Sequence, residues 1–176
     1  MTKIWSINAV VNELAKIAAS HAELKSFGYG ELNSIDSQEQ LLVKYAQLWV
    51  EPINTQLILG KNSSVDQRRF VLYCYDLIRQ DEKNVISTWN QTELILIDVC
   101  RLLQYSSGGF RLVNNPILTP MSERFSDNVT GYYCEVVIET AEIVGTCEMP
   151  YIDNLNLNGN WLYNGVWIDL DTWRNE

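Results

Sequence analysis

The sequence predicts an α+β fold: one mostly antiparallel sheet packed by two helices, in the order α-β-β-β-α-β-β, with a Trp-rich hairpin extension at the C-terminus. In the first segment the apolar residues recur at three- and four-residue steps, which is the spacing of an amphipathic helix, and a later apolar run is too long for a typical strand. Other segments are rich in β-branched and aromatic residues, or alternate apolar and polar positions, as strands do. This order suits a single antiparallel sheet with both helices packed on it.

The first predicted helix covers about residues 4–24. His21 fills the same stripe as its apolar residues, which are Val10, Leu14, Ile17 and Leu24. Ser6 is a suitable N-cap, because its hydroxyl can accept a hydrogen bond from the first turn. The two glycines of Phe27-Gly28-Tyr29-Gly30 stop a helix and allow positive φ, which predicts a sharp turn. The polar residues 33–40 are predicted to form a loop.

Three strands are predicted next. The β-formers of residues 45–50 indicate the first strand, and Pro52 blocks its continuation as a central strand. Residues 55–60 form the second strand, followed by a hairpin loop over 61–67 and a third strand over 69–78. Both faces of the third strand are largely apolar or aromatic. Such a strand is either central and covered, or it faces a neighbouring subunit.

Residues 92–103 predict the second helix, because this apolar run is too long for a typical strand and carries three charges. Its β-branched residues leave a strand as the alternative. Strands over 110–113 and 117–121 are predicted as partners that flank a turn at Asn114-Asn115-Pro116. Alternation of apolar and polar residues over 132–139 indicates the last strand of the sheet.

The composition changes after Pro150, so we expect an α+β domain over residues 1–150 and an aromatic extension over 151–176. Asn164-Gly165 between two apolar triplets is a strong signal for a two-residue hairpin. An isolated hairpin is marginal in water, so its aromatic residues need a surface to lie on. Either the domain itself or a neighbouring molecule can supply that surface, and we favour the neighbour. The predicted partner-contact residues are Trp161, Tyr163, Trp167 and Trp173.

Length and charge limit the possible functions. A chain of 176 residues fits one compact domain with one hydrophobic core. The formal charge of −9 repels polyanions, which argues against nucleic-acid binding as the main function. The chain has neither an apolar run of about 20 residues nor the residue order of a signal peptide, so we expect no membrane partner and synthesis in the cytoplasm of the host.

No catalytic, cofactor or metal site is predicted. The only histidine, His21, has no nucleophile motif to accompany it and is more often a packed polar residue in such a place. Glu135 and Glu139 share a strand face, where acidic residues are routine. The paired glycines precede no Gly-Lys-Ser or Gly-Lys-Thr. The four cysteines, Cys74, Cys100, Cys134 and Cys147, have no zinc spacing, and the acids Asp169, Asp171 and Glu176 lack the ligand pattern of a calcium loop. We expect the first three cysteines to be core residues and no disulfide framework.

The order of short motifs over about residues 4–150 resembles a group of small neck proteins from tailed phages, notably phages of Bacteroidetes hosts and crAss-like phages. The motifs are the leading helix ending in His21, Phe27-Gly28-Tyr29-Gly30, the segments 45–50 and 70–76, a long apolar segment, the segment 122–132, an alternating strand, and Cys147-Glu148-Met149-Pro150. The resemblance implies the tail-completion or tail-terminator fold, which assembles as rings between portal and tail and has no catalytic residues to transfer.

The sequence therefore predicts a non-enzymatic virion protein that forms a homo-oligomeric ring at the phage neck, contacts portal or adaptor and tail proteins, and surrounds the DNA channel. An acidic ring offers few cations to grip phosphates, so DNA would pass through without specific binding. The alternative is a soluble protein-binding module or adaptor that uses the aromatic C-terminal extension. A hydrolase is the third hypothesis.

Overall fold

The structure is a computed structural model that describes residues 7–32, 44–59, 64–78, 84–105, 110–124, 128–142, 161–163 and 166–168. Within these residues the chain forms two helices, α1 (Ile7–Ser20) and α2 (Val85–Gln104). The strands are β1 (Ser26–Tyr29), β2 (Gln47–Leu59), β3 (Ser64–Leu77), β4 (Phe110–Leu112), β5 (Thr119–Arg124), β6 (Asn128–Glu142), β7 (Trp161–Tyr163) and β8 (Val166–Ile168).

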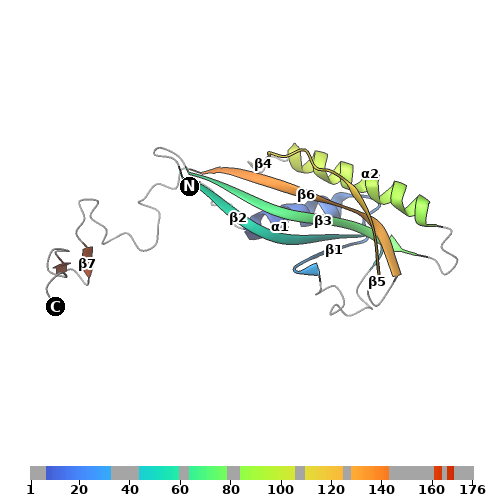
Figure 1. Cartoon of the computed structure of the whole chain (residues 1–176), viewed down its shortest axis with the longest axis horizontal. Coiled ribbons are helices and arrows are strands. Elements are labelled where there is room, and N and C mark those ends of the chain that lie inside the picture. The colour runs from blue at the N-terminus through green and yellow to red at the C-terminus, as the bar shows by residue number, and fades with distance from the viewer. Residues whose placement is uncertain are drawn as a thin grey trace.

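Six strands form one sheet in the order β1-β2-β3-β6-β4, and β5 also pairs with β6. Only β1 and β2 run parallel; all the other pairs in this sheet are antiparallel. The long strands β2, β3 and β6 lie side by side, and α1 lies behind them in the view of Figure 1. The predicted α+β fold, with two helices packed on a mostly antiparallel sheet, is confirmed.

Both helices pack on the same face of the sheet and on each other. Their apolar stripes meet the alternate residues of the long strands that point toward them, as the two-residue period of a strand requires. The core on this face includes Leu14 and Val10 of α1, Leu96 and Val99 of α2, and Leu48, Leu72, Cys74, Cys134 and Val136 of the sheet.

The helix predicted at residues 92–103 is present, and the strand alternative is excluded. α2 begins earlier than predicted, at Val85, and Thr88 and Thr92 in its first turns are buried with their hydroxyls hydrogen-bonded. The Thr92 hydroxyl donates to the carbonyl oxygen of Thr88 at 2.7 Å. The first turns are polar in composition although one of their faces is buried, so the apolar pattern does not predict a helix there. α1 is shorter than predicted and ends at Ser20, one residue before His21.

The two strands predicted at 45–50 and 55–60 are a single strand, β2, so the prediction of a break was wrong. A bulge at Ile53 shifts the register to β3 between Pro52 and Asn54. β1 pairs with β2 only from Gln47 to Val50, so Pro52 lies on an edge segment. A proline without an N–H fits an edge and a bulge, and β2 continues through it.

Two further local predictions were wrong. The segment predicted to turn, residues 27–30, belongs largely to strand β1, and positive φ occurs only afterwards, at Gly30 with 134°. The segments predicted as mutual partners, 110–113 and 117–121, do not pair with each other. β4 and β5 each pair with β6 instead, at opposite ends of the same edge. Local patterns identified strand formers here, but pairing depends on the long β6 strand.

The predicted C-terminal hairpin is present in the backbone. β7 and β8 pair antiparallel as a two-stranded sheet of their own, with Trp161 opposite Ile168. A division of the chain at residue 150 stays a prediction, since residues 143–160 lie outside the described part. In the described ranges, neither helix has the length and apolarity to cross a bilayer.

Candidate assembly surface

The outer edge of β2 is the largest unpaired backbone edge that the described strands present. β1 covers β2 as far as Val50, whose carbonyl oxygen accepts a further hydrogen bond from Gly30 N–H at 3.0 Å. From Pro52 to Leu59 the inner side of β2 pairs with β3, while no described strand pairs with its outer side. Such an edge is a template for an additional strand, because alternate N–H and C=O groups point outward from it.

This edge is apolar as well as unpaired. Ile53, Leu57 and Ile58 are 50%, 55% and 42% exposed. The eight residues from Pro52 to Leu59 include no charged residue. Proteins usually protect an edge with charges, prolines or bulges, and here the proline and the bulge protect only the first part. The segment from Thr55 to Leu59 lacks such protection, which is typical of a surface that a partner covers.

On the opposite side of the sheet, two short strands and one side chain cover β6. β4 covers β6 from Ile138 to Thr140, and β5 covers it from Asn128 to Tyr133. Between them, Asn114 takes the place of a strand: its Nδ2 donates to the Glu135 carbonyl oxygen at 2.8 Å, and its Oδ1 accepts from Val137 N–H at 2.7 Å. The two sides of the sheet are therefore unlike: β2 presents one long unpaired edge, whereas the other side ends in the shorter strands β4 and β5.

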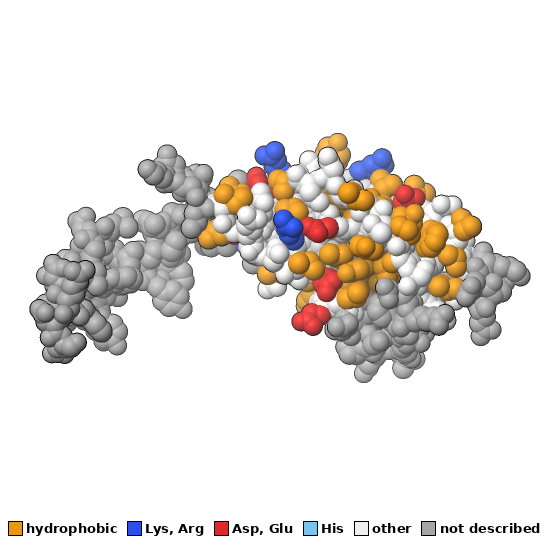
Figure 2. Space-filling view, viewed as in Figure 1, with side chains coloured by type: hydrophobic (Ala, Val, Ile, Leu, Met, Phe, Trp, Pro, Cys, Tyr) orange, Lys and Arg blue, Asp and Glu red, His pale blue; other side chains and the backbone are white. Residues whose placement is uncertain are grey.

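The face of the sheet away from the helices carries aromatic and charged side chains. Tyr73 and Tyr133 lie with ring centroids 5.8 Å apart, and the Tyr73 hydroxyl donates to a Glu51 carboxylate oxygen at 2.8 Å. Arg69 and Glu135 form an ion pair at 3.3 Å. Figure 2 shows hydrophobic side chains gathered on one face of the molecule, with acidic and basic groups among them.

One end of this second face is buried. Trp49, Tyr75 and Val129 form a small cluster, and the Tyr75 hydroxyl donates to Gln47 Oε1 at 2.9 Å. Burial raises the pKa of the Tyr75 phenol above its ordinary value, and the neighbouring Tyr45 adds to the shift. The sequence predicts that residues 69–78 form either a central, covered strand or one that faces a neighbouring subunit. The first alternative holds at this end, because β3 lies between β2 and β6 and Tyr75 is buried.

The predicted partner-contact residues are described only in part. The backbone of Trp161, Tyr163 and Trp167 lies in β7 and β8, and their side chains lie outside the described part of the chain. Trp173 lies outside the described residues altogether. Their role as contact residues stays a prediction.

Side chains weighed for chemistry have ordinary neighbours. His21 Nε2 lies 3.8 Å from an Asp98 carboxylate oxygen, and its Nδ1 accepts from Glu23 N–H at 3.3 Å. The Glu139 carboxylate accepts from Gln67 Nε2 at 3.0 Å, as Glu135 binds Arg69. No cluster of three metal-binding side chains occurs within the described ranges. The expected absence of catalysis stays a prediction.

Sequence reasoning missed the open edge, because it divided β2 in two. The signal was present as an uncharged run of eight residues ending in Leu57-Ile58-Leu59. To predict one strand from that run, one must know that Pro52 lies on an edge, next to a bulge. Whether it lies on an edge depends on how far β1 extends, and the sequence of β2 does not show this.

Comparison with known proteins gives no assignment: no family model matches the chain, and no curated protein matches it.

Proposed function

We propose that this chain is a structural protein of a tailed-phage virion, and that copies of it form a ring at the neck that joins the portal and capsid to the tail. In this proposal the ring surrounds the DNA channel. Its partners are further copies of the chain together with portal or adaptor and tail proteins. The protein has no catalytic role.

The observation that carries the proposal is the open, apolar edge of β2. Exposed Ile53, Leu57 and Ile58 on an uncharged edge favour permanent coverage by another protein surface. The outer side of β6 is already paired with β4 and β5, so in this proposal the β2 edge meets a different surface of the next copy. A contact between two different surfaces closes into a ring when the rotation between subunits permits it.

The C-terminal extension supplies the second surface in this proposal. Residues 151–176 of one copy reach the neighbouring copy, with Trp161, Tyr163, Trp167 and Trp173 as contact residues. Tryptophan and tyrosine suit this task, because they bury a large rigid area at a low entropic cost. A hairpin of two three-residue strands gains stability from docking on a surface that already exists.

The charge of the chain is compatible with a DNA channel. With 13 basic and 22 acidic residues, copies arranged in a ring repel the phosphate backbone. DNA that passes through such a ring is held by few ionic contacts and can slide.

Assembly is tested by native mass spectrometry and negative-stain imaging of the full chain, alone and mixed with the portal and tail proteins of the same genome. We expect rings in the mixture for the wild type. We expect Leu57→Lys to abolish rings, because a lysine in the middle of the β2 edge places a charge in the contact.

Leu94→Lys is the matched control. Leu94 is 62% exposed on α2, comparable to the 55% of Leu57 on β2, and the same charge is introduced far from the strand edge. We expect this variant to form rings as the wild type does. Rings that tolerate Leu57→Lys, or a wild type that stays monomeric with every neck protein, would contradict the proposal.

The second candidate function is a soluble protein-binding module or adaptor. The observation that favours it is the separate two-stranded sheet of β7 and β8, which forms a unit of its own in the hydrogen-bonding pattern. In this alternative the aromatic hairpin binds one unrelated protein. A one-to-one complex in native mass spectrometry, with no ring under any condition, distinguishes it from the neck protein.

A further inference from the structure

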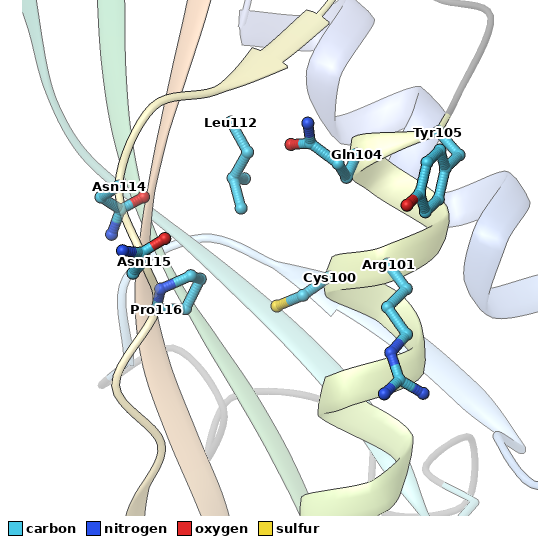
Figure 3. A pocket seen from close by; sticks show the side chains of 8 residues that line it. All are labelled: Cys100, Arg101, Gln104, Tyr105, Leu112, Asn114, Asn115 and Pro116. Atoms are coloured by element: carbon cyan, nitrogen blue, oxygen red, sulfur yellow. The ribbon is translucent and has the colours of Figure 1, made fainter.

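A pocket of about 340 Å³ opens between the C-terminal half of α2 and the chain that follows β4. It is lined by Arg101, Gln104 and Tyr105 from the helix side and by Asn114, Asn115 and Pro116 opposite. Cys100 lies between these two walls. Figure 3 shows its sulfur directed from α2 toward Pro116. The pocket is open to solvent, and it gives small molecules access to one thiol of the domain.

A second thiol lies behind the first. Cys134 of β6 is fully buried, and its Sγ is 3.9 Å from the Sγ of Cys100. Both residues are free thiols. A disulfide bond is about 2 Å long, so the two sulfurs would need to approach by roughly 2 Å in total to become bonded. Side-chain rotation in two residues can provide a shift of this size.

The two thiols differ in reactivity. The hydrogen bond between the two thiols lowers the pKa of Cys100, although burial opposes this effect. The same hydrogen bond and burial raise the pKa of Cys134. A thiolate is the nucleophilic form of cysteine, so Cys100 is the thiol that both ionises more easily and faces the pocket.

We propose that Cys100 is an oxidant-reactive site and that Cys134 is its resolving cysteine, so that hydrogen peroxide admitted by the pocket converts the pair to a disulfide. The Cys100 thiolate attacks one peroxide oxygen, the O–O bond breaks, and the departing hydroxide takes up a proton to become water. Cys100 is then a sulfenic acid. The Cys134 sulfur attacks the Cys100 sulfur, the S–O bond breaks, and hydroxide leaves with the Cys134 proton as a second water. Each sulfur loses one electron, and the peroxide gains two.

The product links α2 to β6 across the core. Cys74 provides an internal comparison, because it lies on the same face of the sheet and is fully buried, and burial together with nearby acidic groups raises its pKa. It lines no part of this pocket. The proposal therefore predicts that peroxide oxidises Cys100 in preference to Cys74, although both thiols belong to the core.

The test is hydrogen peroxide treatment of the folded full chain carrying Cys147→Ala, followed by non-reducing peptide mapping. We expect a Cys100–Cys134 cross-link and a reduced Cys74. In Cys134→Ala we expect Cys100 to stop at the sulfenic acid, which dimedone labels. In Cys100→Ala we expect Cys134 to remain reduced. The initial oxidation of Cys100 should exceed that of Cys74 on the order of tenfold, since thiolate character and access both favour it.

The outcome with Cys147→Ala alone is decisive even if a core variant fails to fold. Peptides that remain unlinked while circular dichroism shows a native protein would overturn the proposal. So would a Cys134 that oxidises equally well in folded Cys100→Ala, or a Cys74 that reacts as fast as Cys100.

Discussion

Asn114 shows how one side chain can replace a stretch of strand. β4 and β5 leave a gap on the edge of β6, and the backbone groups in that gap would otherwise compete for water or for a foreign strand. The Asn114 amide has one donor group and one acceptor oxygen, which match the Glu135 carbonyl and the Val137 N–H. The edge of β6 is thereby satisfied without a third strand.

Replacing this amide removes both bonds at once. We expect Asn114→Ala to lower the free energy of unfolding by about 1–3 kcal/mol, because a partly buried N–H and a carbonyl lose their partners. Urea unfolding followed by circular dichroism measures the change. Asn115→Ala is the control, since its side chain is exposed and adjacent. Equal stability of the two variants would show that the Asn114 amide is dispensable.

The Tyr75 phenol, at the buried end of the sheet face away from the helices, makes the stability of the protein depend on pH. Its phenol is fully buried and bonded to the equally buried Gln47, and its pKa is raised above the ordinary value of about 10. Above that pH the unfolded chain loses the phenol proton while the folded chain retains it. The stability that the neutral phenol contributes is therefore present below pH 10 and declines as the pH rises further.

We expect Tyr75→Phe to be less stable than the wild type by about 1 kcal/mol at pH 8, because Gln47 loses a buried hydrogen bond. This deficit should shrink when unfolding is measured above pH 10, since the wild type loses stability there and the variant has no phenol at this position to ionise. Tyr105→Phe, at an exposed tyrosine, is the matched control and should leave stability unchanged at both pH values. A deficit that is constant with pH would refute this explanation.

At the scale of elements, the sequence predicts the two helices and most of the long strands but not their limits. The length of the apolar run 92–103 predicts α2, and in the structure Ile95, Val99 and Leu103 of this run are buried. Its first two turns were missed because buried threonines read as polar. The prediction divided β2 at Pro52, because a proline in a strand is tolerated only where the neighbouring edge is empty. Neither the burial of the threonines in α2 nor the empty edge beside Pro52 can be predicted from the sequence of the segment itself.

The edge of β2 should become protected only on assembly. In the isolated protein, we expect the outward-facing amide hydrogens between Ile53 and Leu59 to exchange rapidly, because no described strand accepts hydrogen bonds from them. In the assembled ring, hydrogen exchange measured by mass spectrometry should slow for this peptide. Central peptides of β6 serve as the internal control and should be slow in both states. Slowed exchange confined to α2 would move the contact to another surface.

For the whole molecule, composition and segment order were sufficient to predict the fold class, with two helices on one mostly antiparallel sheet. The parallel pairing of β1 and β2 was not predictable, because Phe27 to Gly30 has the composition of a turn and becomes a strand only beside β2. The candidate contact surface was found in part. The aromatic hairpin has a local signal in Asn164-Gly165, whereas the β2 edge is defined by what its neighbours leave uncovered.

Removal of residues 151–176 separates folding from assembly. We expect the shortened chain to keep its far-ultraviolet circular dichroism and its cooperative unfolding, because the six-stranded sheet and both helices lie before residue 143. Ring formation should weaken or disappear in native mass spectrometry. Wholesale unfolding of the shortened chain would instead make the extension part of the core.

The difference between the two sides of the sheet also affects whether this protein can form fibrils at high concentration. Many copies held together present the same uncharged strand to one another, a situation that favours endless fibrils of stacked sheets. Fibril growth requires each added molecule to expose a fresh edge on its far side. Here the far side ends in the short strands β4 and β5, and Asn114 bonds to β6 between them. A molecule added at β2 therefore offers no second edge as long as the one it covers, and continued stacking lacks an equivalent edge to grow from.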